Sequence, residues 1–154
     1  MRERLERNAE TMGADNVRAL DGDAEEIPLP DAFVDAVTTN GVLNLVPDKP
    51  AAIAEIHRVL RPGGRLQVAD IVLAETPSEA CRRKPELWAE CIVGATKEEE
   101  YLDHFRDAGF AEVEVLSRLD YFARSPSEET REVAASFGAE AIVLRGRKES
   151  SEVS

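Results

Sequence analysis

Residues 58–71 read RVLRPGGRLQVADI, and within this stretch a helix ends, a tight turn follows and an apolar strand runs into an acid. Pro62 ends the helix, because proline cannot continue the helical hydrogen-bond ladder. Gly63 and Gly64 then turn the chain into a strand predicted over 66–72. Alternation of helices and strands along a chain favours a parallel β-sheet covered by helices.

The segments before this stretch continue the alternation. The spacing of apolar residues predicts an amphipathic helix over 2–12, a short strand over 17–20 and a strand over 33–38 that ends at Thr39, Asn40 and Gly41. Prolines and aspartates in DGDAEEIPLPD, residues 21–31, predict an irregular acidic loop between these strands. A helix opened by VPDKP then runs towards Pro62.

The segments after it predict a helical region, two further helices and two strands. A helical region interrupted at Pro85 comes first, and Thr96 with Glu99 forms a capping box for a helix that ends at Gly109. The remaining elements are a strand over 113–122, a helix opened by Ser125, Pro126 and Glu128 that runs to Gly138, and a strand over 139–147. We therefore expect one domain over 1–148 and a disordered tail over 149–154.

The composition limits the classes of partner. A chain of 154 residues with 43% hydrophobic and 32% charged residues is expected to fold as one globular unit. Its formal net charge of -12 argues against binding to nucleic acids and to anionic membranes. No apolar run is long enough to span a bilayer and the charged amino terminus is unlike a secretory signal, so a cytoplasmic protein is expected.

Polar residues follow three of the predicted strands, at the sheet edge where ligands of open α/β sheets bind. They are the segments 21–24 and 39–44 and the acid Asp70. A carboxylate in such a position can accept hydrogen bonds from a ligand, or it can cap a helix and order the next loop. Both interpretations remain open for Asp70.

Two longer motifs resemble class I methyltransferases that use S-adenosylmethionine. They are GDAEEIPLPDAFVDAV and TTNGVLNLVPDKPAAIAEIHRVLRPGGRLQVADIV, and PELWAECIVGA, EEEY and SFGAEAIVLRG are similar to the arsenite methyltransferase branch. The resemblance implies an α/β fold, a Rossmann-like sheet that ends in an antiparallel β-hairpin. It also implies that Asp23 and Ala24 contact the adenine of S-adenosylmethionine, that Asn40 and Gly41 lie beside its methionine end, and that Asp70 lies near the substrate.

Cys91 is the residue that the resemblance assigns to the methyl acceptor. Arsenic(III) is a soft, thiophilic centre, which a thiolate suits, so Cys91 is a candidate arsenic ligand and acceptor-binding residue. A cysteine at this helical position equally suits a buried core residue. The family has a further cysteine where alignment on SFG places Ala134. Cys81 lies outside the motif, and His57 and His104 lack partners at metal-binding spacing.

The chain departs from the family at its amino-terminal side, because no GxG sequence occurs anywhere in it. The family's first two strands and its glycine-rich cofactor loop have no counterpart here, so we expect a sheet truncated at the N-terminus and weakened cofactor binding. Their loss would leave strand 17–20 without neighbours and expose the edge of strand 33–38. Exposed edges recruit other strands, which predicts non-native pairing or a homo-oligomer.

The function expected from the resemblance is methyl transfer from S-adenosylmethionine to arsenic(III) or another soft nucleophile, impaired in this shortened chain. Proximity and orientation, rather than a strong base, would supply most of the catalysis. Two alternatives remain open. The chain can be a non-catalytic oligomerising or binding remnant of a methyltransferase, or it can methylate a small organic molecule.

Overall fold

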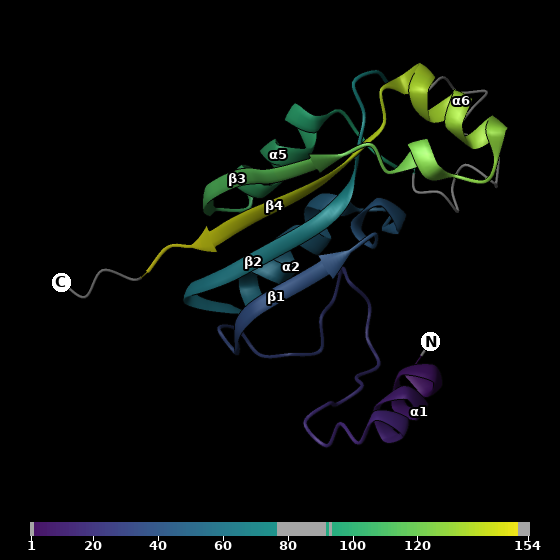
Figure 1. Cartoon of the computed structure of the whole chain (residues 1–154). Coiled ribbons are helices and arrows are strands. Elements are labelled where there is room, and N and C mark those ends of the chain that lie inside the picture. The colour runs from purple at the N-terminus through teal and green to yellow at the C-terminus, as the bar shows by residue number, and fades with distance from the viewer. Residues whose placement is uncertain (1, 77–91, 93, 151–154) are drawn as a thin grey trace.

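The computed structural model of the chain describes residues 2–76, 92 and 94–150. Figure 1 shows its elements, which follow the alternation of the sequence. In chain order they are α1 (Arg2–Met12), β1 (Val34–Asn40), the 3-10 turn η1 (Leu43–Leu45), α2 (Lys49–Val59), β2 (Leu60–Val72), α5 (Glu98–Asp107), β3 (Phe110–Leu119), the 3-10 turn η2 (Phe122–Arg124), α6 (Glu128–Phe137) and β4 (Glu140–Lys148).

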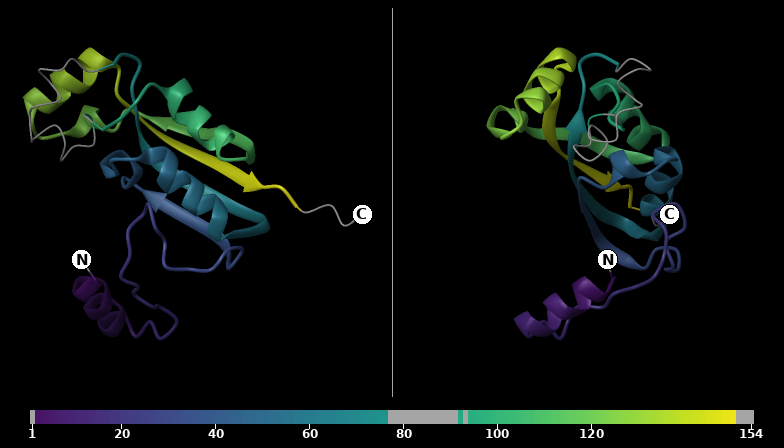
Figure 2. Two further views of the ribbon diagram at one scale, coloured as in Figure 1. Left: turned by 180° about the vertical axis from the view of Figure 1, so that it is seen from behind. Right: turned by 90° about the vertical axis from the view of Figure 1, so that its right-hand side faces the viewer.

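The strands form one mixed sheet in the order β1-β2-β4-β3. The β1–β2 pair is parallel, and β4 pairs antiparallel with both β2 and β3. Helices α2 and α5 cover one face of this sheet, and α6 packs on the opposite face only at its end, where Ile71 and Ala141 contact the cluster that contains Ala134 (Figures 1 and 2). The expected Rossmann-like α/β sheet with an antiparallel carboxyl-terminal pair is therefore confirmed.

The main hydrophobic core lies between the sheet and these two helices. Leu66 and Val68 of β2 are buried against Ile53 of α2 and against Tyr101 and Phe105 of α5. The two aromatic rings meet edge to face with their centroids 5.3 Å apart, a favourable geometry for aromatic pairs. A smaller cluster under α6 contains Ile71, Ile92, Phe122 and Ala134.

The stretch 58–71 folds as expected, with one refinement. Helix α2 ends at Val59, before Pro62, and β2 begins at once at Leu60. The β1–β2 register jumps from Val34↔Leu60 to Ala36↔Arg65, so the Pro-Gly-Gly segment forms a bulge inside the strand. A Cβ on Gly64 would lie 2.7 Å from the Arg61 carbonyl oxygen, which explains why a glycine occupies this position.

The prediction of a strand over 17–20 is wrong. This segment has no regular structure, and Val17 and Leu20 are 46% and 43% exposed. A strand is stable only when a neighbouring strand takes its backbone hydrogen bonds, and none lies beside these residues in the described part of the chain.

Three helix and strand boundaries also differ from expectation. Helix α5 begins at Glu98 after Lys97, without a side-chain cap, so the Thr96 capping box does not form. Helix α6 is capped by Ser127 rather than Ser125. Strand β3 begins at Phe110, directly after the turn at Gly109, because the apolar Phe110 side chain is buried in the core.

Candidate functional site

Asp70 lies near the carboxyl end of β2 and is only 4% exposed. Its Oδ1 accepts hydrogen bonds from Asn44 Nδ2 at 2.8 Å and from the Ile71 amide at 2.9 Å. Its Oδ2 accepts from the Asn44 amide at 3.3 Å and from the Tyr101 hydroxyl at 3.2 Å. The carboxylate thus fastens the loop after β1, through Asn44, and helix α5, through Tyr101, to the end of β2.

Burial controls the protonation of this network. It raises the pKa of Asp70 above the ordinary range, and hydrogen bonds from Ile71, Asn44 and Tyr101 partly oppose this rise. Burial, together with the adjacent Asp70 charge, also raises the pKa of Tyr101. Tyr101 therefore stays a hydrogen-bond donor, and because protein groups donate to both oxygens of Asp70, the geometry favours an ordering role for this acid over direct proton transfer.

The side-chain oxygen of Asn44 lies at this end of the sheet and has no hydrogen-bond partner among the described residues. Its Nδ2 also donates to the Ile71 carbonyl at 2.7 Å, which sets the orientation of the side-chain amide. Its Oδ1 is buried and accepts no hydrogen bond from the described residues, and the same holds for the hydroxyls of Thr39 and Thr96. Buried acceptors without donors are costly, so this end of the sheet is suited to a ligand or water that donates hydrogen bonds.

The loop after β1 leaves space for a ligand at Asn40 and Gly41. Asn40 is exposed, and the Gly41 amide donates to the Ala69 carbonyl at 2.9 Å. Gly41 has φ +64, and a Cβ placed on it would meet nothing within 4 Å. The glycine thus serves a left-handed turn next to open space.

Asp23 and Ala24 lie in a tight turn that approaches the same loop. Asp23 Oδ1 accepts the Glu25 amide at 3.3 Å, and the exposed side chain is accessible to further donors. The Glu25 carboxylate in turn accepts the Asp48 amide at 2.8 Å, which places the turn beside the start of α2. The turn at Asp23 is therefore tied to the end of the loop that runs from Asn40 to the start of α2.

Arg58 holds this acidic loop in place, a role that the sequence did not reveal. Its guanidinium donates to the carbonyls of Leu29 at 2.8 Å and Ile27 at 2.9 Å, and it pairs with Asp31 and Glu55 at 2.7 and 2.6 Å. The paired guanidinium lowers the pKa of Glu55. A fork of donors that bridges loop and helix is a geometry that arginine, and not lysine, can form.

The remaining candidate residues lie elsewhere. Cys91 and Cys81 are outside the described residues, so the proposed arsenic ligand stays a prediction. His57 packs edge to face on Phe110 with centroids 5.0 Å apart, and burial, with the nearby Lys148 charge, lowers its pKa. The described part of the chain contains no cluster of three or more metal-binding side chains and no helix long and apolar enough to cross a bilayer.

Only the folded structure shows that Asn44 and Tyr101 bind Asp70. The sequence marked Asn44 as the last residue of a polar segment after a strand, but no local pattern singled out Tyr101. Its contact with Asp70 joins residues 31 positions apart, which no local pattern records.

Comparison with known proteins identifies a family that this chain matches. Residues 2–109 match a family model described as a methyltransferase domain. An arsenite methyltransferase of Halobacterium salinarum is 31% identical over 105 residues, which are 68% of this chain and 27% of that protein. A 27-O-demethylrifamycin SV methyltransferase of Amycolatopsis mediterranei is 38% identical over 89 residues, which are 56% of this chain and 33% of that protein.

A solved structure has the same arrangement of elements. The crystal structure of an arsenic(III) S-adenosylmethionine methyltransferase from Chlamydomonas reinhardtii superposes with a TM-score of 0.69 at 27% identity and covers 85% of this chain and 44% of that protein. The chain thus spans between about a quarter and a third of the length of the two curated relatives.

Proposed function

Because this chain belongs to the class I S-adenosylmethionine-dependent methyltransferase family, in its arsenite methyltransferase-like branch, we propose that it binds S-adenosylmethionine and transfers its methyl group. The observation that carries this proposal is the meeting of the Asp23 turn, the open loop at Gly41 and the Asp70–Asn44–Tyr101 network at one end of the sheet. Ligands of open α/β sheets bind at that end.

The described residues fit two parts of the cofactor. The exposed carboxylate of Asp23 can accept from the adenine amino group, with the Ala24 backbone beside the ring. Gly41 and Asn40 leave room for the methionine end, and the unpartnered Asn44 Oδ1 can accept a hydrogen bond from a ligand donor. When bound, S-adenosylmethionine supplies an electrophilic methyl group on a sulfonium sulfur.

The protein's own contribution is orientation. Arg58 holds the loop that carries Asp23, and Asp70 holds the loop that carries Asn40 and Gly41. Two fixed loops on either side of the cofactor position would align the methyl group with an incoming nucleophile, which is the main source of rate enhancement when no strong base is needed.

For the acceptor we propose arsenic(III) or another soft nucleophile. The names of the arsenite methyltransferase relatives support this acceptor, and Cys91 is the thiolate that we assign to it. The relative that acts on a rifamycin supports an organic acceptor instead. Ala134, which is 2% exposed, stands where the resemblance places a further family cysteine, and because its methyl group cannot bind arsenic, it favours the organic alternative.

Calorimetric titration of the chain with S-adenosylmethionine tests the proposal. We expect binding that Asp23→Ala weakens by roughly tenfold, the usual effect of losing one hydrogen bond to a ligand. Asp15→Ala, a matched change at another exposed acid, should leave the affinity unaltered. An absence of binding heat in the intact chain would favour the non-catalytic alternative, with which the lack of a GxG sequence is consistent.

A second measurement separates the acceptors. If the chain binds the cofactor, Cys91→Ser should abolish methylation of arsenite while cofactor affinity is retained, because a hydroxyl is a poor ligand for a soft centre. Arsenite methylation that survives in this variant would exclude Cys91 as the arsenic ligand. Methylation of phenolic compounds but not of arsenite would support the organic acceptor.

We also propose that a homo-oligomer covers the free edge of β1. In the described sheet β1 pairs only with β2, so its other edge presents backbone groups without strand partners. Such an edge is a template for pairing with another chain. An intact chain that is monomeric at every concentration in analytical ultracentrifugation would contradict this proposal.

A further inference from the structure

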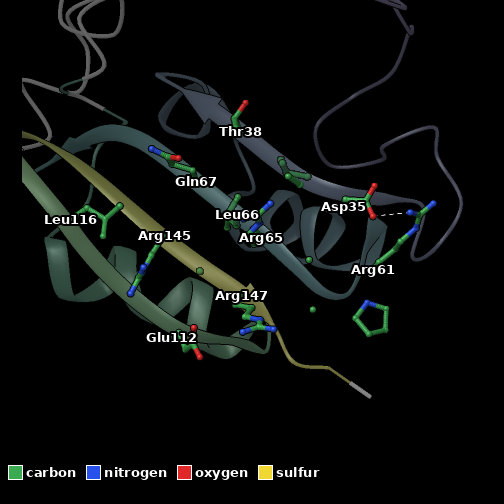
Figure 3. A pocket seen from close by; sticks show the side chains of 16 residues that line it. Asp35, Thr38, Arg61, Arg65, Leu66, Gln67, Glu112, Leu116, Arg145 and Arg147 are labelled. Atoms are coloured by element: carbon green, nitrogen blue, oxygen red, sulfur yellow. Dashed lines mark hydrogen bonds and ion pairs between the residues drawn. The ribbon is translucent and has the colours of Figure 1, made fainter. Parts of the chain in front are cut away.

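The face of the sheet opposite α2 and α5 contains a depression of about 910 Å³. Figure 3 looks onto this face, which is lined by Arg61, Arg65, Gln67, Arg145, Arg147 and Leu116 among others. It is distinct from the candidate methyl-transfer site, because Arg65 and Arg147 lie at the other end of β2 from Asp70. We call it the arginine face.

The strand register places two arginines of this face directly opposite one another. Arg65 of β2 pairs with Arg147 of β4, and neither has an acidic partner among the described residues. Arg61 and Arg145, in contrast, are paired with Asp35 and Glu114, both at 2.7 Å. Like charges opposite one another on neighbouring strands are destabilising. In a protein with a net charge of -12, this pair marks a local site for a negative partner.

Helix α1 carries acidic side chains on one flank and packs little against the rest of the described chain. None of its residues is buried, although Leu5, Ala9 and Met12 form an apolar stripe. Glu3, Glu6 and Glu10 follow one another at helical spacing along one flank of that stripe, and because Glu6 pairs with Arg2 at 3.4 Å, Glu3 and Glu10 are the acids that can face a partner. The helix lies beyond β1 in every view (Figures 1 and 2), where an ion pair between Arg2 and Asp21 ties it to its own linker.

We propose that the arginine face docks helix α1 of a second copy of this chain. The acidic flank of the helix lies against Arg65 and Arg147, and its apolar stripe covers Leu116, which is 48% exposed. Each copy has one such face and one such helix, so two copies satisfy each other reciprocally in a closed dimer. The contact also supplies the helical cover that the second face of an α/β sheet normally has.

Charge exchange between two variants tests this dimer. In Arg147→Glu the altered face repels Glu10, and in Glu10→Arg the altered helix repels Arg147, so each variant alone should self-associate at least tenfold more weakly, roughly the effect of juxtaposed like charges. Mixed in equal amounts, the two variants should associate again, because both contacts of the mixed dimer are complementary. Sedimentation velocity over a concentration series measures each case, and circular dichroism shows that the variants are folded.

The matched control is Arg106→Glu on α5, a charge reversal at a residue that pairs with Asp103 on the covered side of the sheet. It should leave self-association unaltered. A chain that stays monomeric throughout, an Arg147→Glu variant that associates like the unmodified chain, or a mixture that fails to associate would each overturn the proposal. In the last case α1 docks within its own molecule or on another protein. A dimer formed through the backbone edge of β1 would keep its self-association in both Arg147→Glu and Glu10→Arg, and this result separates it from the helix-docked dimer.

Discussion

At the scale of single residues, Asp70 determines whether the candidate site keeps its shape. It is the acceptor for donors from η1, β2 and α5, which would otherwise be buried without partners. A residue with this role affects both stability and ligand binding. The two effects can be separated experimentally, because global unfolding and local loop order are measured differently.

Replacement of Asp70 by alanine should lower the free energy of unfolding by about 3 kcal/mol, since it leaves several buried donors unpaired. Asp103→Ala, at an exposed acid that pairs with Arg106, should change it by less than about 0.5 kcal/mol. Urea denaturation monitored by circular dichroism provides both values. Equal stability of the two variants would show that the Asp70 network contributes nothing to the fold.

His57 gives a pH dependence whose sign follows from its surroundings. Burial and Lys148 lower its pKa in the folded chain, so the unfolded chain binds the proton more readily. The stability that neutral His57 contributes is complete above its ordinary pKa of about 6.5 and is lost as the pH falls through the lower folded value. Urea midpoints measured from neutral to mildly acidic pH should decline less in His57→Gln than in the unmodified chain, while His104→Gln should keep the full decline.

At the scale of elements, the ends of α6 show how a local sequence sets a boundary. Ser127 accepts the Thr130 amide at 3.2 Å at the start of this helix, and Gly138 ends it with φ 59. A Cβ on Gly138 would lie 2.8 Å from the Ala74 Cβ, so both the conformation and the contact with Ala74 require glycine. The helix therefore has a defined beginning and end.

Two serines of this helix form a matched pair for measurement. Ser127→Ala should destabilise the chain by about 1 kcal/mol, because it removes the amino-terminal cap. Ser136→Ala should be neutral or slightly stabilising, since the Ser136 hydroxyl only bonds back to the Val133 carbonyl on the exposed side. Thermal unfolding of both variants gives the comparison, and a larger loss in Ser136→Ala would argue against Ser127 as the cap.

At the scale of the whole molecule, stability is concentrated in the strands that have neighbours on both sides. Strands β2 and β4 each pair with two others and contain Leu66, Val68, Ile142 and Leu144, all buried. Helix α1 has 11 residues and buries none of them, and helices of that length are marginal in water by themselves. Strands β2 and β4 should therefore open much less readily than helix α1.

Hydrogen exchange at two protein concentrations tests this distribution. At low concentration we expect the amides of β2 and β4 to exchange slowest and those of α1 to exchange fastest. At high concentration α1 should become protected while β2 changes little, because docking on a second copy orders the helix. Protection of α1 that is independent of concentration would contradict this expectation.

The sequence by itself determined those features that depend on neighbouring residues. The helix before Pro62, the strand that contains Asp70 and the turn at Gly138 follow from local spacing and residue type. The order of helices and strands could be predicted for the same reason. The two misplaced caps show its limit, since the Thr96 hydroxyl bonds to none of the described residues and Ser127, rather than Ser125, accepts the Thr130 amide. The motifs around Asp23 and Asn40 stand out by their resemblance to the methyltransferase family.

Only the tertiary structure decided which distant residues meet. Residues 17–20 have a strand-like sequence but no neighbour, so they do not pair, and Tyr101 and Asn44 become partners of Asp70 because α5 and η1 pack against the end of β2. The sheet register places Arg65 opposite Arg147. Burial, register and the availability of a partner are properties of the folded molecule as a whole, and no local pattern of residues contains them.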